Sequence, residues 1–222
     1  MVNKQPTFHR LSEFHLLLQF EKISLEELHA WYHHLENLKI SGCIEVVPAR
    51  TSITLHFETY FWDAQEIISA LKTETIRKQS TLSQKSHTIP VCYEAGLDLD
   101  EISASVNLSK NELIKKHSMQ EYTVAMTGFL PGFLYLDGLD SALHIPRKST
   151  PRKSVPDGSV AVGGSQTGIY GLESPGGWHI LGLTPIRIFD RDTLPPMKFL
   201  SGDKVRFSPI SIQDYENGNW QI

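Results

Sequence analysis

The sequence predicts two domains: an α+β sandwich of split βαβ type over residues 1–85, and a mainly-β barrel over residues 88–222. In the first part, strand-like apolar runs alternate with two amphipathic helical patterns. Residues 79–87 are polar and have no periodicity, which is typical of a linker. From Tyr122 onward, short apolar runs alternate with Gly and Pro clusters, a pattern that favours a closed or nearly closed barrel.

The first domain has the predicted order strand, helix, strand, strand, helix. Residues 14–20 are an apolar run that predicts a strand, and Ser24 and Glu27 have the spacing of a capping box at a helix start. Apolar residues of this helix recur at intervals of three and four, and Gly42 is expected to stop it. Two further strands and a second amphipathic helix are predicted at residues 43–47, 52–57 and 64–78.

A strand predicted over residues 88–93 fits either the end of the first domain or the start of the second. Two short helices follow at residues 99–106 and 110–117, and Ser109 and Glu112 form a capping box that opens the second. The alternation typical of the barrel begins only after these helices.

The composition is that of an ordinary globular protein, with 40% hydrophobic and 21% charged residues among 222. A net charge of -4, without a basic run flanked by aromatics, argues against a nucleic-acid or anionic-membrane partner. The first twenty residues lack signal-peptide features, no apolar stretch is long enough to span a membrane, and two cysteines are too few for a disulfide scaffold. We therefore expect a cytoplasmic protein.

Phe129, Pro131 and Phe133 belong to a segment, residues 128–135, that holds two glycines, a proline and three aromatics. Glycine allows unusual backbone angles and close approach, while proline fixes one dihedral and removes a donor. The segment is therefore either a shaped loop at a site or a barrel corner with aromatic packing. A tight turn directly precedes Trp178. The ring of Trp178 either fills the end of the barrel or, less commonly, forms a surface on which a ligand binds.

Arg147 and Arg152 each follow a proline, so two guanidinium groups stand behind two rigid turns. Such a fork can bind a carboxylate or a phosphate through paired hydrogen bonds. The alternative is a pair of surface arginines with no ligand.

The glycine-rich residues 163–168 do not form a nucleotide site. A P-loop needs Lys and Ser or Thr after its last glycine, where this chain has Ile169 and Tyr170. The nucleophile-elbow pattern also fails, because it would need glycine in place of Thr167. Ser165 is expected to be a turn residue.

The ten histidines do not predict a metal site. His29 and His33 lie four residues apart on the first helix, but no acidic or cysteine partner completes a ligand set nearby. His117 ends a predicted helix, where the helix dipole favours a cation. It is either a general acid or base, or simply the C-terminal cap of that helix.

Several uncommon segments occur in a fixed order: CYEAGLDL at 92–99, His117, Tyr122, GFLPGFLYL at 128–136, PRKSTPR at 146–152, VPDGSVAVGGSQTGIY at 155–170 and SPGGWHILGLTP at 174–185. Together they resemble the KipI family, whose members are also known as the B subunit of 5-oxoprolinase and as the first subunit of allophanate-hydrolase-like carboxyltransferase modules. The resemblance is strong over residues 88–200 and general before that. Glu94 departs from the family pattern, in which glycine is expected.

The resemblance implies that the barrel is cyclophilin-like and that the chain is a non-nucleotide-binding subunit of an ATP-dependent 5-oxoprolinase. That complex opens 5-oxo-L-proline to L-glutamate and uses ATP and Mg, whereas this chain alone is expected to be inactive and without a cofactor. The implied partners are a homologous second barrel protein, the KipA-type C subunit of the complex, and a LamB/YcsF-type A subunit.

We expect substrate or partner binding on one set of side chains and a catalytic role on His117. The binding set is Phe129, Pro131, Phe133, Arg147, Arg152, Gln166, Tyr170 and Trp178.

Two other functions are alternatives to this one. One family member is an antikinase, which would dock on a sporulation histidine kinase through the barrel and need no catalytic pocket. A prolyl isomerase follows only from the cyclophilin-like fold, and fold does not carry function. The tripeptide Phe8-His9-Arg10 lies in the wrong domain for an isomerase site.

Overall fold

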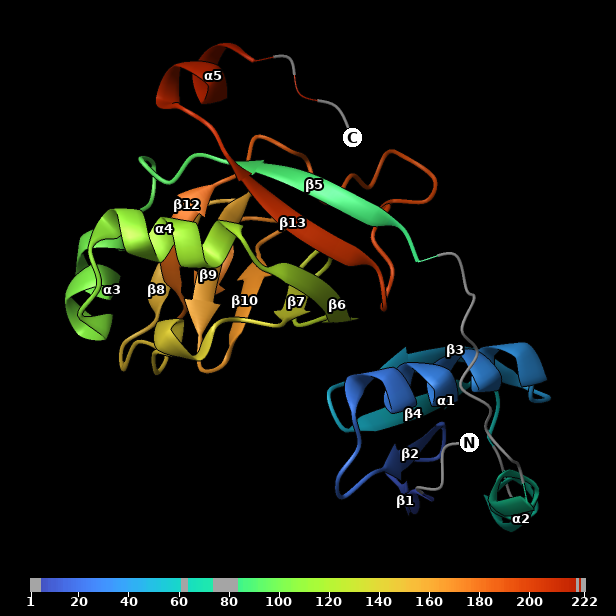
Figure 1. Cartoon of the computed structure of the whole chain (residues 1–222). Coiled ribbons are helices and arrows are strands. Elements are labelled where there is room, and N and C mark those ends of the chain that lie inside the picture. Colours follow the sequence, from blue (N-terminus) through green and yellow to red (C-terminus); the bar gives the residue numbers. More distant parts are fainter. Residues whose placement is uncertain (1–4, 61–63, 74–83, 219, 221–222) are drawn as a thin grey trace. The chain divides into compact units, whose positions relative to one another are not determined.

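The computed structural model describes residues 5–60, 64–73, 84–218 and 220. Two compact units divide the chain, Met1–Ser83 and Gln84–Ile222 (Figure 1). None of the helices within the described ranges has the length and apolar character that a membrane crossing requires.

The N-terminal unit holds a four-stranded antiparallel sheet in the order β1-β2-β4-β3. Its strands are Thr7–Arg10 (β1), His15–Gln19 (β2), Cys43–Pro48 (β3) and Ser52–Phe57 (β4). Its helices are Leu25–Leu38 (α1) and Ala64–Thr73 (α2). The sequence missed β1, a short and mostly exposed edge strand without an apolar pattern. Residues 74–78 of the second predicted helix lie outside the described residues.

One core joins the sheet to both helices. Alternate side chains of the inner strands, including Leu18 and Leu55, pack against Trp31 of α1 and Leu71 of α2. Trp31 is fully buried, as the apolar stripe of α1 predicts. The two helices therefore cover the same face of the sheet.

The limits of α1 show one confirmed signal and one correction. The Ser24 hydroxyl accepts the Glu27 N–H at 3.3 Å, and the Glu27 carboxylate accepts the Ser24 N–H at 3.0 Å, which is the predicted capping box. The helix does not run on to Gly42. It ends at Leu38, because Lys39 takes the left-handed conformation with φ of 46° and stops it.

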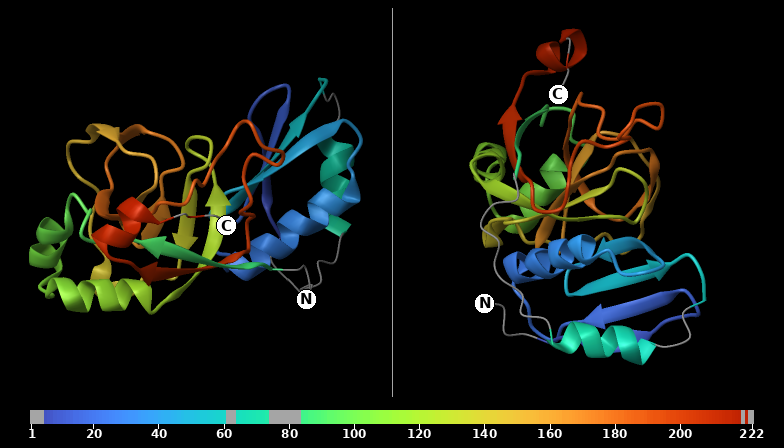
Figure 2. Two further views of the ribbon diagram at one scale, coloured as in Figure 1. Left: turned by 90° about the horizontal axis from the view of Figure 1, so that it is seen from above. Right: turned by 90° about the vertical axis from the view of Figure 1, so that its right-hand side faces the viewer.

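The C-terminal unit is a curled mixed sheet of seven strands in the order β12-β9-β10-β7-β6-β13-β5 (Figures 1 and 2). The strands are Ser86–Val91 (β5), Glu121–Thr127 (β6), Leu134–Asp137 (β7), Ser159–Gly163 (β9), Gln166–Ile169 (β10), His179–Leu183 (β12) and Lys204–Pro209 (β13). Two backbone hydrogen bonds between Cys92 and Leu183, of 2.8 and 3.0 Å, tie the end of β5 to the end of β12.

The first strand of this unit answers the question that the sequence left open for residues 88–93. β5 pairs in parallel with β13, so it opens the second unit. It starts at Ser86, and both Ser86 and His87, which were expected in the linker, are part of the sheet. His87 fits there because its imidazole Nε2 lies 3.0 Å from the buried carboxylate of Asp203.

Two helices lie between β5 and β6, as predicted: Leu99–Val106 (α3) and Lys110–Ser118 (α4), with the capping box of Ser109 and Glu112 intact. The remaining elements are short. They are Ser141–Leu143 (η1), the two-stranded sheet of Arg152–Val155 (β8) with Ser174–Gly176 (β11), and Ile212–Asn217 (α5).

His117 at the end of α4 lies in the core of the curled sheet and is fully buried. The Thr167 hydroxyl donates to the Ala161 carbonyl at 2.9 Å, so its oxygen accepts from His117 Nε2–H, also at 2.9 Å. The Nδ1 atom therefore accepts the Tyr93 hydroxyl at 2.7 Å. Burial lowers the pKa of His117 from 6.5 to about 3. The imidazole of His117 is therefore neutral at pH 7, and both of its nitrogens are hydrogen-bonded inside the core.

This protonation state predicts a pH-dependent stability. Between pH 6.5 and about 3 the unfolded chain binds a proton at His117 that the folded chain does not. The free energy of unfolding should therefore fall as the pH drops through this window, by at most about 1.4 kcal/mol per pH unit. Urea unfolding at pH 7, 6 and 5 measures the slope. His117→Gln, which cannot titrate, should reduce it, and an unchanged slope would contradict the assignment.

We also expect the two units to unfold separately, because each has its own core. Leu55→Ala, which empties part of the N-terminal core, should destabilise that unit by about 2–5 kcal/mol. Calorimetry of the full chain should then show one transition moving to lower temperature while the other stays in place. A common shift of both transitions would show that the units unfold together.

Candidate functional site

The curled sheet is buried on both faces, so its central strands do not alternate between apolar and polar residues. Along β9, Val160 and Val162 enter the main core, whereas Ala161 joins a second cluster on the opposite face. β7 behaves in the same way, with Leu134 and Leu136 in the main core and Tyr135 packed against the second cluster. The members of this outer cluster are Phe133, Val155, Ala161, Tyr170, Trp178 and Ile180.

A cavity of about 290 Å³ borders the outer cluster. Five of the residues that the sequence singled out line it, and they come from four separate motifs: Phe129, Phe133, Arg147, Tyr170 and Trp178. Sequence reasoning missed Tyr135, Lys148 and Pro151 in the same lining, although all three stand inside or beside the quoted motifs. The motifs thus converge in space.

Phe133 is the centre of the aromatic wall. Its ring centroid lies 4.5 Å from that of Tyr135 and 4.8 Å from that of Tyr170. The rings of Trp178 and Phe129 meet it nearly edge-on at 5.5 and 5.9 Å. Each such pair contributes roughly 0.5–1.5 kcal/mol beyond its burial, so the wall is a rigid surface.

Two glycines let the rings lie against the backbone. A Cβ atom at Gly163 would stand 2.8 Å from the Trp178 ring, and one at Gly168 would stand 3.1 Å from the Phe133 ring. Both distances are too short for an unstrained contact. The glycine-rich motif that fails as a nucleotide loop therefore shapes the floor beneath the aromatic wall.

Phe129 marks the mouth of the cavity. Its ring is 67% exposed, and its backbone has φ of 70°, a left-handed conformation that costs a bulky residue of the order of 1–3 kcal/mol. Pro131, two residues later, is exposed and does not line the cavity. The segment at 128–135 is thus both a shaped loop and an aromatic corner.

Arg147 supplies the positive charge of the site. Its guanidinium carbon lies 5.4 Å from the centre of the Trp178 ring, a cation–π contact, and the side chain is exposed. No carboxylate pairs with it among the residues that the structure describes. Burial raises the pKa of Tyr135, an effect that Arg147 partly offsets, so this phenol stays protonated at neutral pH.

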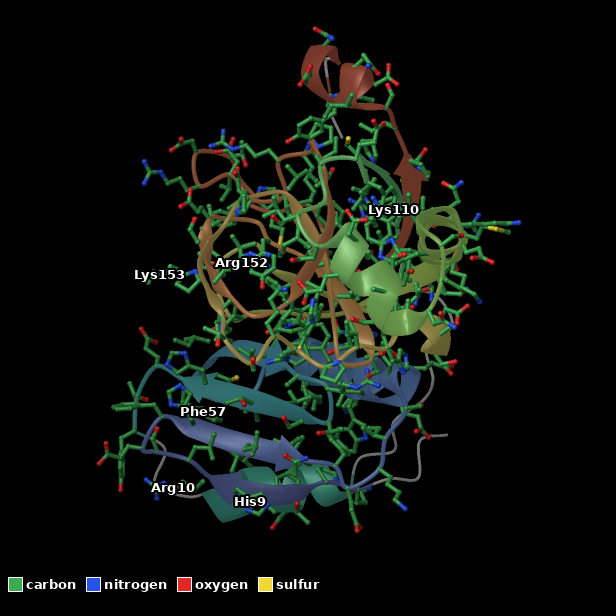
Figure 3. The ribbon with its side chains drawn as sticks, turned by 90° about the vertical axis from the view of Figure 1, so that its left-hand side faces the viewer. His9, Arg10, Phe57, Lys110, Arg152 and Lys153 are labelled. Carbon is green, nitrogen blue, oxygen red and sulfur yellow. The ribbon has the colours of Figure 1, made fainter. Side chains whose placement is uncertain are left out.

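Arg152 is not the second arm of an anion fork. Its guanidinium donates to the Asp98 carboxylate at 2.7 and 2.5 Å, while neighbouring Lys153 extends into solvent (Figure 3). Burial alone would raise the pKa of Asp98, but the hydrogen bonds from Arg152, the Ile180 N–H and Lys148 outweigh it and lower that pKa. Of the two predicted arginines, Arg152 is thus bound by an acid distant in sequence, and Arg147 alone is left unpaired among the described residues.

Two further candidates lie away from the cavity. Gln166 starts β10 opposite Gly163, is half-buried and does not line the cavity. His117 is enclosed on the core side of the sheet, so it does not reach the reactants of any site on the outer face.

The arrangement suits binding more than bond cleavage. Lys148 and Arg152 are neutralised by Asp98 and Glu101, which leaves Arg147 to attract an anion. The aromatic walls favour a small, flat, apolar body attached to that anion. Within the described ranges, no group of three or more His, Cys, Asp or Glu side chains could hold a metal ion.

Comparison with known proteins supports the resemblance drawn from the motifs. Residues 6–199 match the family described as carboxyltransferase domain, subdomain C and D. The chain is 37% identical to the B subunit of 5-oxoprolinase from Bacillus subtilis (strain 168), over 85% of this chain and 84% of that protein. It is 40% identical to the B subunit of 5-oxoprolinase from Haemophilus influenzae, over 74% and 78%.

Solved structures show the same architecture. TTHA0988 superposes with a TM-score of 0.78 at 32% identity; the match covers 89% of this chain but only 40% of that longer one. The urea amidolyase of K. lactis has a TM-score of 0.78 at 18% identity, over 97% of this chain and 15% of the enzyme, and so shows the fold alone. The chain therefore belongs to the carboxyltransferase subdomain C and D family, as a homologue of the 5-oxoprolinase B subunit.

Proposed function

We propose that this chain is the B subunit of an ATP-dependent 5-oxoprolinase, and that the cavity beneath Arg147 binds the anionic substrate or the partner surface that presents it. The observation that carries the proposal is the aromatic cavity with one uncompensated cation, on a chain homologous to the 5-oxoprolinase B subunit. 5-Oxoproline is a five-membered lactam with one carboxylate, so its charge and shape suit this lining.

The reaction explains why more than one protein chain is needed. Amide resonance stabilises the lactam, and its opening at neutral pH is helped by phosphorylation of the carbonyl oxygen and by stabilisation of the developing charge. We assign ATP and Mg to other subunits of the complex, because this chain has no P-loop motif. The role left to this chain is to bind and orient the substrate or the partner surface that presents it.

For partners, we propose a homologous second barrel protein of the KipA type and a LamB/YcsF-type A subunit, with the complex in the cytoplasm. Homology to proteins named as one lettered subunit of 5-oxoprolinase supports a multi-subunit assembly. The match covers only 40% of the TTHA0988 chain, so in that protein the matching region is joined to further sequence. This supports the proposal that this chain works next to another protein. Co-purification with these two partners, followed by a glutamate-release assay, tests the assembly.

Arg147 and Arg152 should respond differently to removal. Arg147→Ala should leave the melting temperature nearly unchanged but raise KM for 5-oxoproline about 30-fold, the equivalent of about 2 kcal/mol for a charged hydrogen bond. Arg152→Ala removes a partner from buried Asp98 and should destabilise the chain by about 2–3 kcal/mol. Thermal unfolding and kinetics of the reconstituted complex measure both. Intact kinetics in Arg147→Ala would show that the substrate binds elsewhere.

The isolated chain should bind Mg-ATP weakly or not at all, and should release no glutamate from 5-oxoproline. Its glycine-rich loop supports aromatic rings and has no lysine to contact a phosphate. Isothermal titration calorimetry of the purified chain with Mg-ATP checks this. A micromolar site on the chain alone would contradict the division of labour between subunits.

A further inference from the structure

Asp98 does not line the cavity, yet its carboxylate binds three residues on two segments of the chain around it. It accepts both bonds of the Arg152 guanidinium, at 2.5 and 2.7 Å, and the Lys148 ammonium at 3.1 Å. It also accepts the backbone N–H of Ile180 at 2.7 Å. The side chain is only 2% exposed, so these bonds are shielded from water.

Each of these partners adjoins a wall of the cavity. Lys148 lines the cavity itself and directly follows Arg147. Arg152 follows Pro151, which also lines it. Ile180 stands two residues after Trp178, and the Asp98 N–H donates to the Ile180 carbonyl at 3.0 Å. One buried carboxylate thus holds both ends of the 148–152 loop and β12, the strand that directly follows Trp178.

The turn that carries Arg147 has two more attachments to residues beside Trp178. His179 Nε2–H donates to the carbonyl of Pro146 at 2.9 Å, and His179 is 5% exposed. The backbone N–H of Lys148 donates to the Gly177 carbonyl at 2.7 Å. The residues on both sides of Arg147 are therefore fixed to the residues on both sides of Trp178.

We propose that Asp98 is a positioning residue of this site: by holding the 148–152 loop against β12, it keeps the Arg147 guanidinium over the Trp178 ring. Arg147 itself is exposed and has no ion pair among the described residues, so only its backbone and the ring define its place. Asp98 also helps neutralise Lys148 and Arg152, which leaves Arg147 as the cation offered to a ligand. The proposal rests on the proposed function where it concerns substrate.

The first test needs no activity. In ¹⁵N spectra of the full chain, the Arg147 Nε–Hε signal is assigned by its loss in Arg147→Ala. The ring current of Trp178 should shift this signal away from the chemical shift of an unstructured arginine. Asp98→Asn should return the signal toward that position. Arg152→Lys, which keeps the charge but not the paired geometry, should do the same and replaces Asp98→Asn if that variant does not fold.

Asp203→Asn is the matched control. Asp203 is also a buried carboxylate of this unit, 4% exposed, but it binds His87 and the backbone N–H groups of Lys85 and Leu200 and does not line the cavity. It should lower the melting temperature without moving the Arg147 signal. If Asp98→Asn and Arg152→Lys leave that signal in place, or if Asp203→Asn moves it equally, the positioning role is overturned.

The second test uses the reconstituted complex. Asp98→Asn should raise KM for 5-oxoproline roughly tenfold, with kcat within about a factor of two of wild type. The reason is that Arg147 binds the ground state and the transition state equally, and a loss of such uniform binding changes KM alone. In an Arg147→Ala background the same change should have almost no further effect. A double variant whose KM equals the product of the single effects overturns the proposal. A wild-type complex that releases no glutamate refutes the proposed function, while the Arg147 signal still decides the role of Asp98.

Discussion

The pairing of Cys92 with Leu183 is the constraint on which the barrel unit depends. It joins the two outermost strands of a seven-stranded sheet, so the sheet must curl and enclose one of its faces. The enclosed face is filled by the main core around His117, and the other face is left to the aromatic cluster. A strand with apolar surfaces on both faces does not alternate between buried and solvent-exposed side chains, which accounts for the continuous burial of β9.

Local signals in the sequence predicted local structure well. Both capping boxes, the apolar stripe of α1 and the change of texture at the barrel are visible in short windows, and the structure confirms them. β1 was missed because it is a short edge strand in which Phe8 alone packs against the core, too little to give an apolar pattern. The capacity of Lys39 to adopt a left-handed conformation was equally invisible, since glycine is the usual signal for that position.

The candidate site could be predicted only in part. The aromatic residues of the rigid, glycine-rich turns line one cavity, and those turns are visible in the sequence. The ion-pair partners of the charged residues could not be predicted from the sequence. Asp98 lies 54 residues before Arg152 along the chain, and no local pattern connects them. The surroundings of His117 could not be predicted for the same reason. A helix end favours a cation only where water or an acid is present, and here Thr167 and Tyr93 surround the ring.

The aromatic wall depends on a missing side chain. At Gly163 the Trp178 ring occupies the volume that any other residue would need for its Cβ atom. A single added methyl group there would displace a ring that lines the cavity, and this ring belongs to the outer cluster rather than to the main core. The shape of the cavity can therefore change by one methyl group without any change in the side chains that fill the barrel.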